Sequence, residues 1–213
     1  MPSREARITG VVGLLEELAA ATIGATFNQY RETGGDDLGP EAPAIRLANL
    51  RQYLTARVCA PVVLVGEAAG WRGARYSGLC LCSERQLISG FAGIGHYRCS
   101  SRHPRGWSEP SATVVQGVLR QEGWSDQVLL VNVVPTHPAG AEPHTNRRPS
   151  GAEIALGAAH LRRLLDIIAP RHLAAIGRIA GAVAGDVPMV RHPAHGGALL
   201  CREQLGTLLG GWL

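Results

Sequence analysis

The chain has 213 residues, of which 46% are hydrophobic and 18% are charged, and its formal net charge is +4 at pH 7. This composition excludes a disordered chain and allows one substantial core, so we expect a single domain spanning residues 1–213. No apolar run approaches the ~20 residues that cross a bilayer, and no charged-then-apolar leader opens the chain, which predicts a cytoplasmic protein without a membrane segment.

The cysteines are few and scattered. Their odd number and the lack of a Cys-x-x-Cys pair argue against a disulfide framework and against a zinc-ribbon site. Their spacing gives no positive support to an iron–sulfur site either. We therefore expect reduced, mostly buried thiols at Cys59, Cys80, Cys82, Cys99 and Cys201.

The hydrophobic pattern predicts helices alternating with strands. Apolar residues recur at helical spacing over 8–30, and Pro43 opens a second helical pattern that reaches Leu54. Continuous apolar runs predict buried strands at 62–66 and 128–134, with further strands at 173–176 and 187–190. Helices are predicted at 83–88, 111–122, 152–168 and 199–209, with one short helix between the last two strands and with Ser83, Ser111 and Ser150 as N-caps.

This alternation predicts an α/β fold. We expect a three-layer α/β/α sandwich over a central, mostly parallel, four-stranded sheet with right-handed crossovers. No internal repeat and no linker that would split the chain is visible in the sequence.

Three polar residues stand at or just after predicted strand ends: Glu67, Asn132 and His192. The carboxyl ends of parallel strands share one edge of the sheet, so the three side chains are expected to meet in one pocket. Each also has a purely structural explanation: Glu67 as a helix cap, Asn132 as a partner for backbone groups, and His192 as the end of a strand. Their joint placement at three matching strand ends favours a functional site.

The three groups suit a planar polar heterocycle. The Asn132 amide can pair with an imide edge such as N3–H and O4 of uracil, whereas cytosine presents the reverse arrangement and would leave buried groups unpaired. The His192 imidazole can donate to charge that develops on a base oxygen as a glycosidic bond breaks. The Glu67 carboxylate can position water and stabilise an oxocarbenium-like sugar.

Three segments of the chain resemble motifs of the uracil-DNA glycosylase superfamily. Gly66-Glu67-Ala68-Ala69-Gly70 resembles the first motif of the thermophile-type (family 4) branch, GEAPG. Asn132-Val133-Val134-Pro135 and the later Asn146-Arg147-Arg148-Pro149 resemble its NVV and Asn-Arg-x-Pro segments, and His192-Pro193-Ala194 resembles its HPS motif. The motifs stand in the expected order from about Pro61 to the end of the chain.

The resemblance implies a role for each residue at the strand ends. Asn132 would read the uracil edge, His192 would hold uracil O2, and Glu67 would position or activate water. Backbone groups at Gly66 and Ala68 would contact the base.

The resemblance also implies a residue that stacks on the base. Leu81 stands where the family usually has a phenylalanine. Either Leu81 packs on the base, or Tyr76, Phe91 or another ring takes over that contact.

Further residues would contact DNA if the resemblance holds. The target base must leave the duplex, because its glycosidic carbon is unreachable in a stacked helix. Ser77 would lie against the DNA, and Arg147 and Arg148 would contact phosphates, although solvated surface charge explains the two arginines equally well. The loop pressing into the duplex would contain Ala194, His195 and Gly196, with His195 as a wedge or as a phosphate contact.

The chain departs from the family 4 pattern at several positions. The branch's iron–sulfur cysteines are absent at the expected places, so we predict no cluster and no other cofactor. His192-x-x-His195, with histidines in nearby loops, fits no standard metal site, and we predict no metal. Arg72 and Arg75 stand where the branch has acidic residues, which makes Glu84 a second candidate for activating water.

The leading hypothesis is therefore a monomeric, monofunctional glycosylase that takes uracil-containing DNA, releases free uracil and leaves an abasic site. A second hypothesis is a uracil- or lesion-DNA binding protein that turns over poorly or stays attached to the site. A third is a nucleotide-handling α/β enzyme with no preference for DNA.

Overall fold

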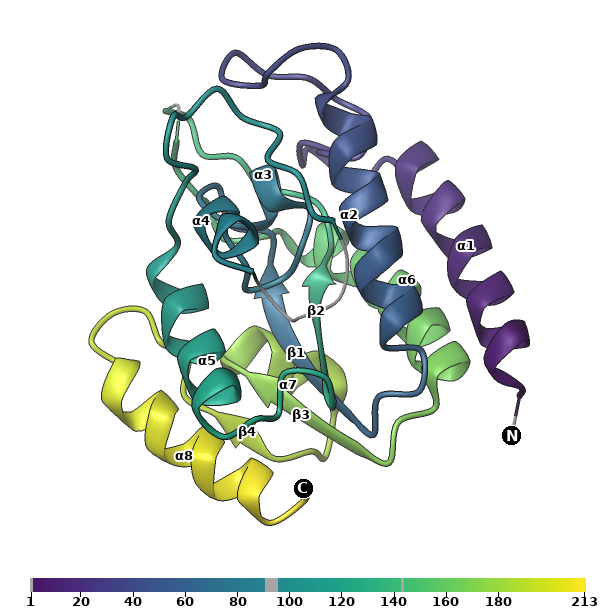
Figure 1. The fold of residues 1–213 in the computed structure, drawn as a ribbon, viewed down its shortest axis with the longest axis vertical. Coiled ribbons are helices and arrows are strands. Elements are labelled where there is room, and N and C mark those ends of the chain that lie inside the picture. Colours follow the sequence, from purple (N-terminus) through teal and green to yellow (C-terminus); the bar gives the residue numbers. More distant parts are fainter. Residues whose placement is uncertain (1, 91–95, 143) are drawn as a thin grey trace.

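The computed structural model describes residues 2–90, 96–142 and 144–213 (Figure 1). Among these residues no helix is long and apolar enough to cross a membrane. Helices and strands follow in the order α1 (Arg4–Ala20), α2 (Ala42–Ala56), β1 (Val62–Ala68), α3 (Ala74–Ser77), α4 (Glu84–Ile88), α5 (Pro110–Gln121), β2 (Val128–Val134), α6 (Gly151–Ile168), β3 (His172–Ile176), α7 (Arg178–Ala184), β4 (Met189–Val190) and α8 (Ala198–Gly210).

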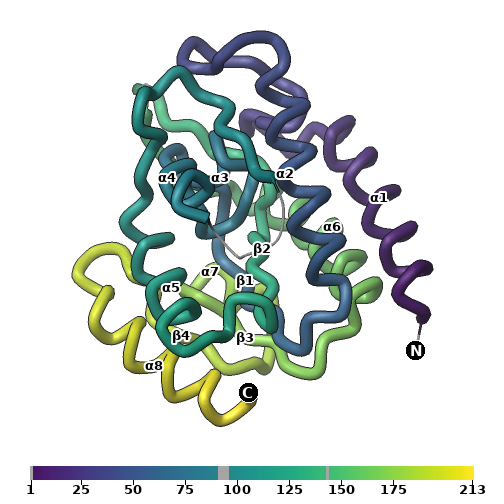
Figure 2. The backbone as a smooth tube through the Cα atoms, viewed as in Figure 1, coloured from purple at the N-terminus to yellow at the C-terminus, as the bar shows by residue number. Residues whose placement is uncertain are grey.

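The four strands form one parallel sheet in the order β2-β1-β3-β4, which confirms the predicted α/β fold. The connections from β1 to β2 and from β2 to β3 run in opposite directions, so right-handed crossovers place α5 on one face and α6 on the other. Figure 2 shows α5 and α8 on the opposite side of the strands from α6. β4 is shorter than the predicted 187–190, and Pro188 has no amide hydrogen to extend it.

The two strands that carry the site lie in the core. Residues 62–65 of β1 are completely buried, as expected for a strand with a neighbour on each side and helices on both faces. β2 is the outer strand, and α2 covers its edge: the Leu130 backbone amide donates to the Tyr53 hydroxyl oxygen at 2.8 Å. This contact satisfies a group that an open sheet edge would leave unpaired.

The predicted helix at 8–30 is wrong in its second half, because α1 ends at Ala20. The Asn28 side-chain amide donates to the backbone oxygens of Leu18 at 2.8 Å and Ala21 at 2.9 Å, which satisfies carbonyls at the helix end. Ile23 still enters the core, from a loop. Hydrophobic spacing alone therefore extended the helix too far.

Two of the three predicted N-caps are confirmed. Ser83 and Ser150 each form a capping box at the start of α4 and α6. Ser111 is not a cap, because α5 begins at Pro110 with Glu109 in the N-cap position. Proline suits a first helical position since its fixed φ matches the helix and its missing amide has no helical acceptor.

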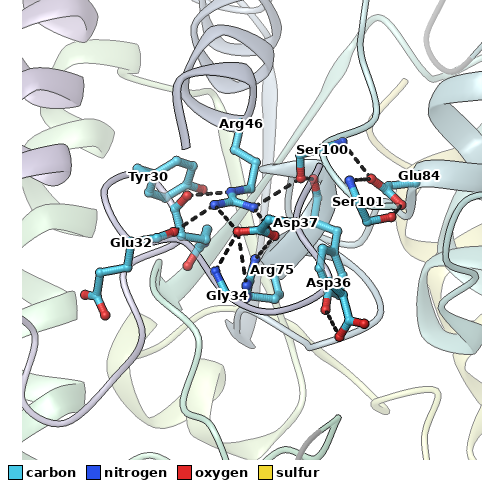
Figure 3. A network of polar contacts seen from close by, with 12 residues as sticks. Tyr30, Glu32, Gly34, Asp36, Asp37, Arg46, Arg75, Glu84, Ser100 and Ser101 are labelled. Atoms are coloured by element: carbon cyan, nitrogen blue, oxygen red, sulfur yellow. Dashed lines mark hydrogen bonds and ion pairs between the residues drawn. The ribbon is translucent and has the colours of Figure 1, made fainter. Parts of the chain in front are cut away.

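A buried ion triad fixes the segments next to the sheet (Figure 3). Asp37 accepts hydrogen bonds from Arg46 Nη1 at 2.8 Å and from Arg75 Nη1 at 3.0 Å, and the Gly34 backbone donates to it at 2.9 Å. Burial opposes ionisation, yet the hydrogen bonds from Arg46, Gly34 and Arg75 hold the pKa of Asp37 below its usual value. The triad joins the loop before α2 to α2 itself and to α3.

Replacing Asp37 by Ala is expected to destabilise the protein by about 3–5 kcal/mol, because two buried guanidinium groups lose their counter-charge. Urea unfolding at neutral pH measures this loss. Asp36→Ala is the matched control: its carboxylate is 48% exposed and pairs with His144, so we expect a cost below about 1 kcal/mol. Equal costs for the two variants would contradict the structural role of the triad.

Candidate functional site

The site begins where the amide of Asn132 lies over β1. The register pairs Asn132 with Gly66, and a Cβ atom at Gly66 would stand only 2.7 Å from Asn132 Oδ1. The glycine therefore creates the space that the amide occupies. Cys80, in the segment between α3 and α4, places its Sγ 3.0 Å from the same oxygen.

Glu67 and His192 meet above the end of β3. A Cβ atom at Gly177 would stand 2.6 Å from Glu67 Oε1 and 3.3 Å from His192 Cβ, and Gly177 has a positive φ of 94°. Glu67 Oε1 also accepts from the Ile179 backbone amide at 3.4 Å, so the expectation that this carboxylate contacts a helix start is met as well. Gly177 thus makes room for both side chains.

The protonation state of His192 follows from its neighbours. Its Nδ1 accepts a hydrogen bond from the Ala194 backbone amide at 3.1 Å, so the neutral ring carries its hydrogen on Nε2. Burial lowers the pKa of His192 below its usual value, against the attraction of Glu67. At pH 7 the ring is therefore a neutral donor through Nε2, which is the form that suits a developing oxyanion.

The structure brings the three sequence-predicted residues to one edge of the sheet. Asn132 reaches from β2 over β1, Glu67 stands near the end of β1, and His192 returns from β4 to the end of β3. Asn132 lies on β2, one neighbour of β1, whereas Glu67 and His192 meet toward β3, the other neighbour of β1. The backbone of Gly66 and Ala68 lies on β1, between the two. The chemical roles of these residues stay predictions.

The segment between α3 and α4 forms one wall beside Asn132. Leu81 is buried and has a positive φ of 46°, and its carbonyl accepts from Gln116 Nε2 at 3.0 Å. Ser77 is completely buried, and its hydroxyl donates to the Cys82 carbonyl at 2.7 Å. In this structure the Ser77 side chain therefore shapes the wall and does not face solvent, where the sequence placed it against DNA.

The two arginines of the Asn-Arg-Arg-Pro segment differ in environment. Arg147 forms a two-pronged ion pair with Glu153, at 2.7 and 2.6 Å, whereas Arg148 is exposed. The Asn146 side chain accepts from the Trp71 backbone amide at 2.9 Å and ties this loop to the turn after β1. Arg147 is thus paired with an acidic side chain, whereas Arg148 has no such ion pair among the described contacts.

The charged residues singled out in the sequence, Arg72, Arg75 and Glu84, contact other parts of the fold. Arg75 is buried in the Asp37 triad, and Arg72 lies over the Trp71 ring at 4.7 Å. Glu84 is completely buried, and its carboxylate accepts from the backbone amides of residues 100, 101 and 107 and from the Ser101 hydroxyl. Glu84 therefore holds a loop in place and exposes no oxygen to a water in the site.

Sequence reasoning missed a partly buried acid, Glu109, beside the turn after β1. A Cβ atom at Gly70 would stand 2.4 Å from Glu109 Oε1, and one at Gly73 would stand 2.3 Å from Glu109 Oε2. Glu109 Oε2 is buried without a hydrogen-bond partner, and burial raises the pKa of Glu109 to about 7. The two glycines, three residues apart, were the available signal for such a close approach.

The loop after His192 projects from the fold next to an exposed leucine. His195 and Gly196 both have positive φ, 53° and 76°, and both are exposed. Leu199, in the first turn of α8, is 82% exposed. The helix predicted at 199–209 is present as α8, and the sequence pattern did not indicate that its first leucine is exposed.

A further feature of the chain is the arrangement of its cysteines and histidines. All five cysteines are free thiols, and among the described residues no group of three or more His, Cys, Asp or Glu side chains is arranged to hold a metal ion. His137, a histidine of the nearby loop, is buried and uses Nδ1 to contact the Ala69 carbonyl at 2.9 Å.

The partly buried Glu109 predicts a pH-dependent stability difference. Since the folded pKa of Glu109 is about 7 and its ordinary value is 4.5, the folded state holds more protons than the unfolded state in this window. The free energy of unfolding therefore falls as pH rises from 4.5 through 7. Glu109→Gln is expected to remove this pH-dependent loss. Its free energy of unfolding, measured by urea unfolding, should rise relative to that of the wild type by about 3 kcal/mol between acidic and alkaline pH. Glu122→Gln, on an exposed acid after the same helix, should show no such difference; a parallel change in both variants would contradict the assignment.

The family of the chain follows from a comparison with known proteins. A sequence profile described as the uracil DNA glycosylase superfamily matches residues 55–201, well over half of the chain. The matched region begins before β1, ends in α8 and contains Glu67, Asn132 and His192. A search of curated proteins finds no match. With its four-stranded parallel sheet and the polar groups gathered at the strand ends, this chain belongs to the uracil DNA glycosylase superfamily.

Proposed function

We propose that this protein is a monofunctional uracil-DNA glycosylase, resembling the family 4 branch but without its cluster. It hydrolyses the N-glycosidic bond of uracil in DNA, releases free uracil and leaves an abasic site. The observation that supports the proposal is the placement of an amide, a carboxylate and a neutral imidazole at the carboxyl ends of one parallel sheet, with Glu67 and His192 in close proximity, in a chain of this superfamily.

The proposed chemistry divides between the two ends of the breaking bond. Water adds to the sugar C1′ and loses a proton, while Glu67 positions this water and stabilises the positive charge that develops on the sugar. The electrons of the C1′–N1 bond pass to the uracil, and His192 Nε2–H donates to the O2 atom on which negative charge develops. The departing uracil anion takes up a proton from solvent. Asn132 pairs with the N3–H and O4 edge, and the backbone of Gly66 and Ala68 contacts the base.

The proposed DNA contacts surround this pocket. Uracil must leave the stack to reach it, and the loop from Ala194 to Gly197 would fill the space that the base vacates. The exposure of His195 and Leu199 supports their use as a wedge. Arg148 would contact a phosphate, while Arg147 would first have to leave Glu153. We propose that the protein acts as a monomer, without a cofactor, in the cytoplasm where it meets the nucleoid.

Base release from synthetic DNA tests the function. Incubation with an oligonucleotide containing one uracil, followed by alkali, is expected to cut the strand at the uracil, with free uracil as the released product. Intact DNA at high enzyme concentration, with tight binding, would instead support the lesion-binding hypothesis. A species that stays attached to DNA after denaturing electrophoresis would support a protein that remains on its site.

His192→Ala is expected to lower the single-turnover rate of uracil release by about 100- to 1,000-fold, because a donor to the developing charge is lost. Binding to uracil-containing DNA, measured by fluorescence anisotropy, should change far less. His96→Ala is a matched control, since His96 is exposed and makes its resolved contacts to Gln52 through backbone atoms. An equal loss in binding and rate for His192→Ala would show that it acts in binding alone.

A further inference from the structure

A buried thiol touches the amide proposed to read the base. Cys80 Sγ lies 3.0 Å from Asn132 Oδ1, and the two residues come from segments 52 positions apart in the chain. Cys80 is 7% exposed, so this contact is made in the interior, where a hydrogen bond does not compete with bulk water. Sequence spacing gave this cysteine no role.

The direction of the hydrogen bond is fixed by the state of the thiol. Burial raises the pKa of Cys80 well above its ordinary value of 9, and the carboxylate of Glu109 acts in the same direction. Cys80 therefore remains a thiol at neutral pH and offers a hydrogen. Of the two ends of the Asn132 amide, the oxygen lies at the thiol and accepts this hydrogen, whereas an NH₂ group in its place would have only the weakly accepting sulfur as a partner.

The remaining surroundings leave the amide space to turn. Asn132 and Cys80 both line a cavity of about 70 Å³ whose other walls are mostly leucine side chains of α1, α2 and α6. Gly66, on the other side, has no side chain to restrain the amide. Apolar walls do not favour the oxygen of an amide over its nitrogen. The hydrogen bond from the thiol therefore decides which end of the amide lies toward Cys80.

We propose that Cys80 is a specificity-determining positioning residue, whose thiol donates to Asn132 Oδ1 and so sets the order in which the amide presents its acceptor and donor to a base. One lone pair of Oδ1 and both Nδ2 hydrogens then face an edge with adjacent N–H and carbonyl groups, as in uracil. A turned amide would match the reversed edge of cytosine. The proposal rests on the proposed function for the identity of the base.

Activity measurements on three variants of buried cysteines test this role. Cys80→Ala is expected to lower single-turnover uracil release by about 5- to 10-fold and to lower the preference for uracil over cytosine, since one buried acceptor loses its donor. Cys80→Ser keeps a donor and should stay within about twofold of the wild type. Cys82→Ala is the matched control, because Cys82 is also buried but its thiol donates to the Ser83 carbonyl.

A double-mutant cycle separates positioning from packing. In an Asn132→Ala background, Cys80→Ala should cause no further loss, because its effect passes through the amide. An equal loss in both backgrounds, or a loss in Cys80→Ser as large as in Cys80→Ala, would overturn the proposal.

A measurement without substrate keeps this inference separate from the proposed function. The side-chain NH₂ signals of Asn132 in an NMR spectrum, assigned by their absence in Asn132→Ala, should form one sharp pair in the wild type and in Cys80→Ser. In Cys80→Ala they should shift and broaden as the amide turns. Unchanged signals in Cys80→Ala would overturn the proposal even if uracil is released, and failure to release uracil would leave this readout valid.

Discussion

The site depends on two positions at the carboxyl edge of the sheet where a side chain is missing. Gly66 lies opposite Asn132 in the register of β1 and β2, and Gly177 lies between Glu67 and His192. A Cβ atom at either glycine would stand within 2.7 Å of a functional oxygen. A parallel sheet with helices on both faces normally fills such positions, so these two glycines leave room for polar side chains at the end of a packed core.

The segments around the pocket are held by buried charges. Asp37 binds two arginines, and Glu84 accepts from the loop at 100–107, so α3, α4 and that loop have little freedom to shift. Desolvation makes such pairs weak sources of net stability, but breaking one is costly, and they therefore specify one arrangement. The arrangement they specify places Cys80 and Leu81 beside the amide of Asn132.

The sequence was sufficient for the sheet and for the three residues at its edge, because continuous apolar runs and their polar ends are local signals. It failed where the deciding partner is distant. Arg75 stands where the family 4 branch has an acidic residue, and its partner Asp37, 38 residues away, becomes visible only in the fold. Glu109 had no sequence signal of its own, and its contact with Gly70 and Gly73 exists only in three dimensions. Hydrophobic spacing likewise cannot tell that Ile23 reaches the core from a loop.

The electrostatics of the site follow from the same arrangement. Cleavage of a glycosidic bond develops positive charge on the sugar and negative charge on the base, so the pocket must serve both signs. A carboxylate at Glu67 suits the sugar, and a neutral His192 suits the base, because its Nε2–H donates without adding a fixed cation that would oppose the sugar. The ion pair of Arg75 with Asp37 also keeps a fixed positive charge away from the sugar, because Asp37 neutralises the guanidinium. In the proposed reaction, hydrogen-bond donors in fixed positions, more than net charge, would thus stabilise the base as it leaves.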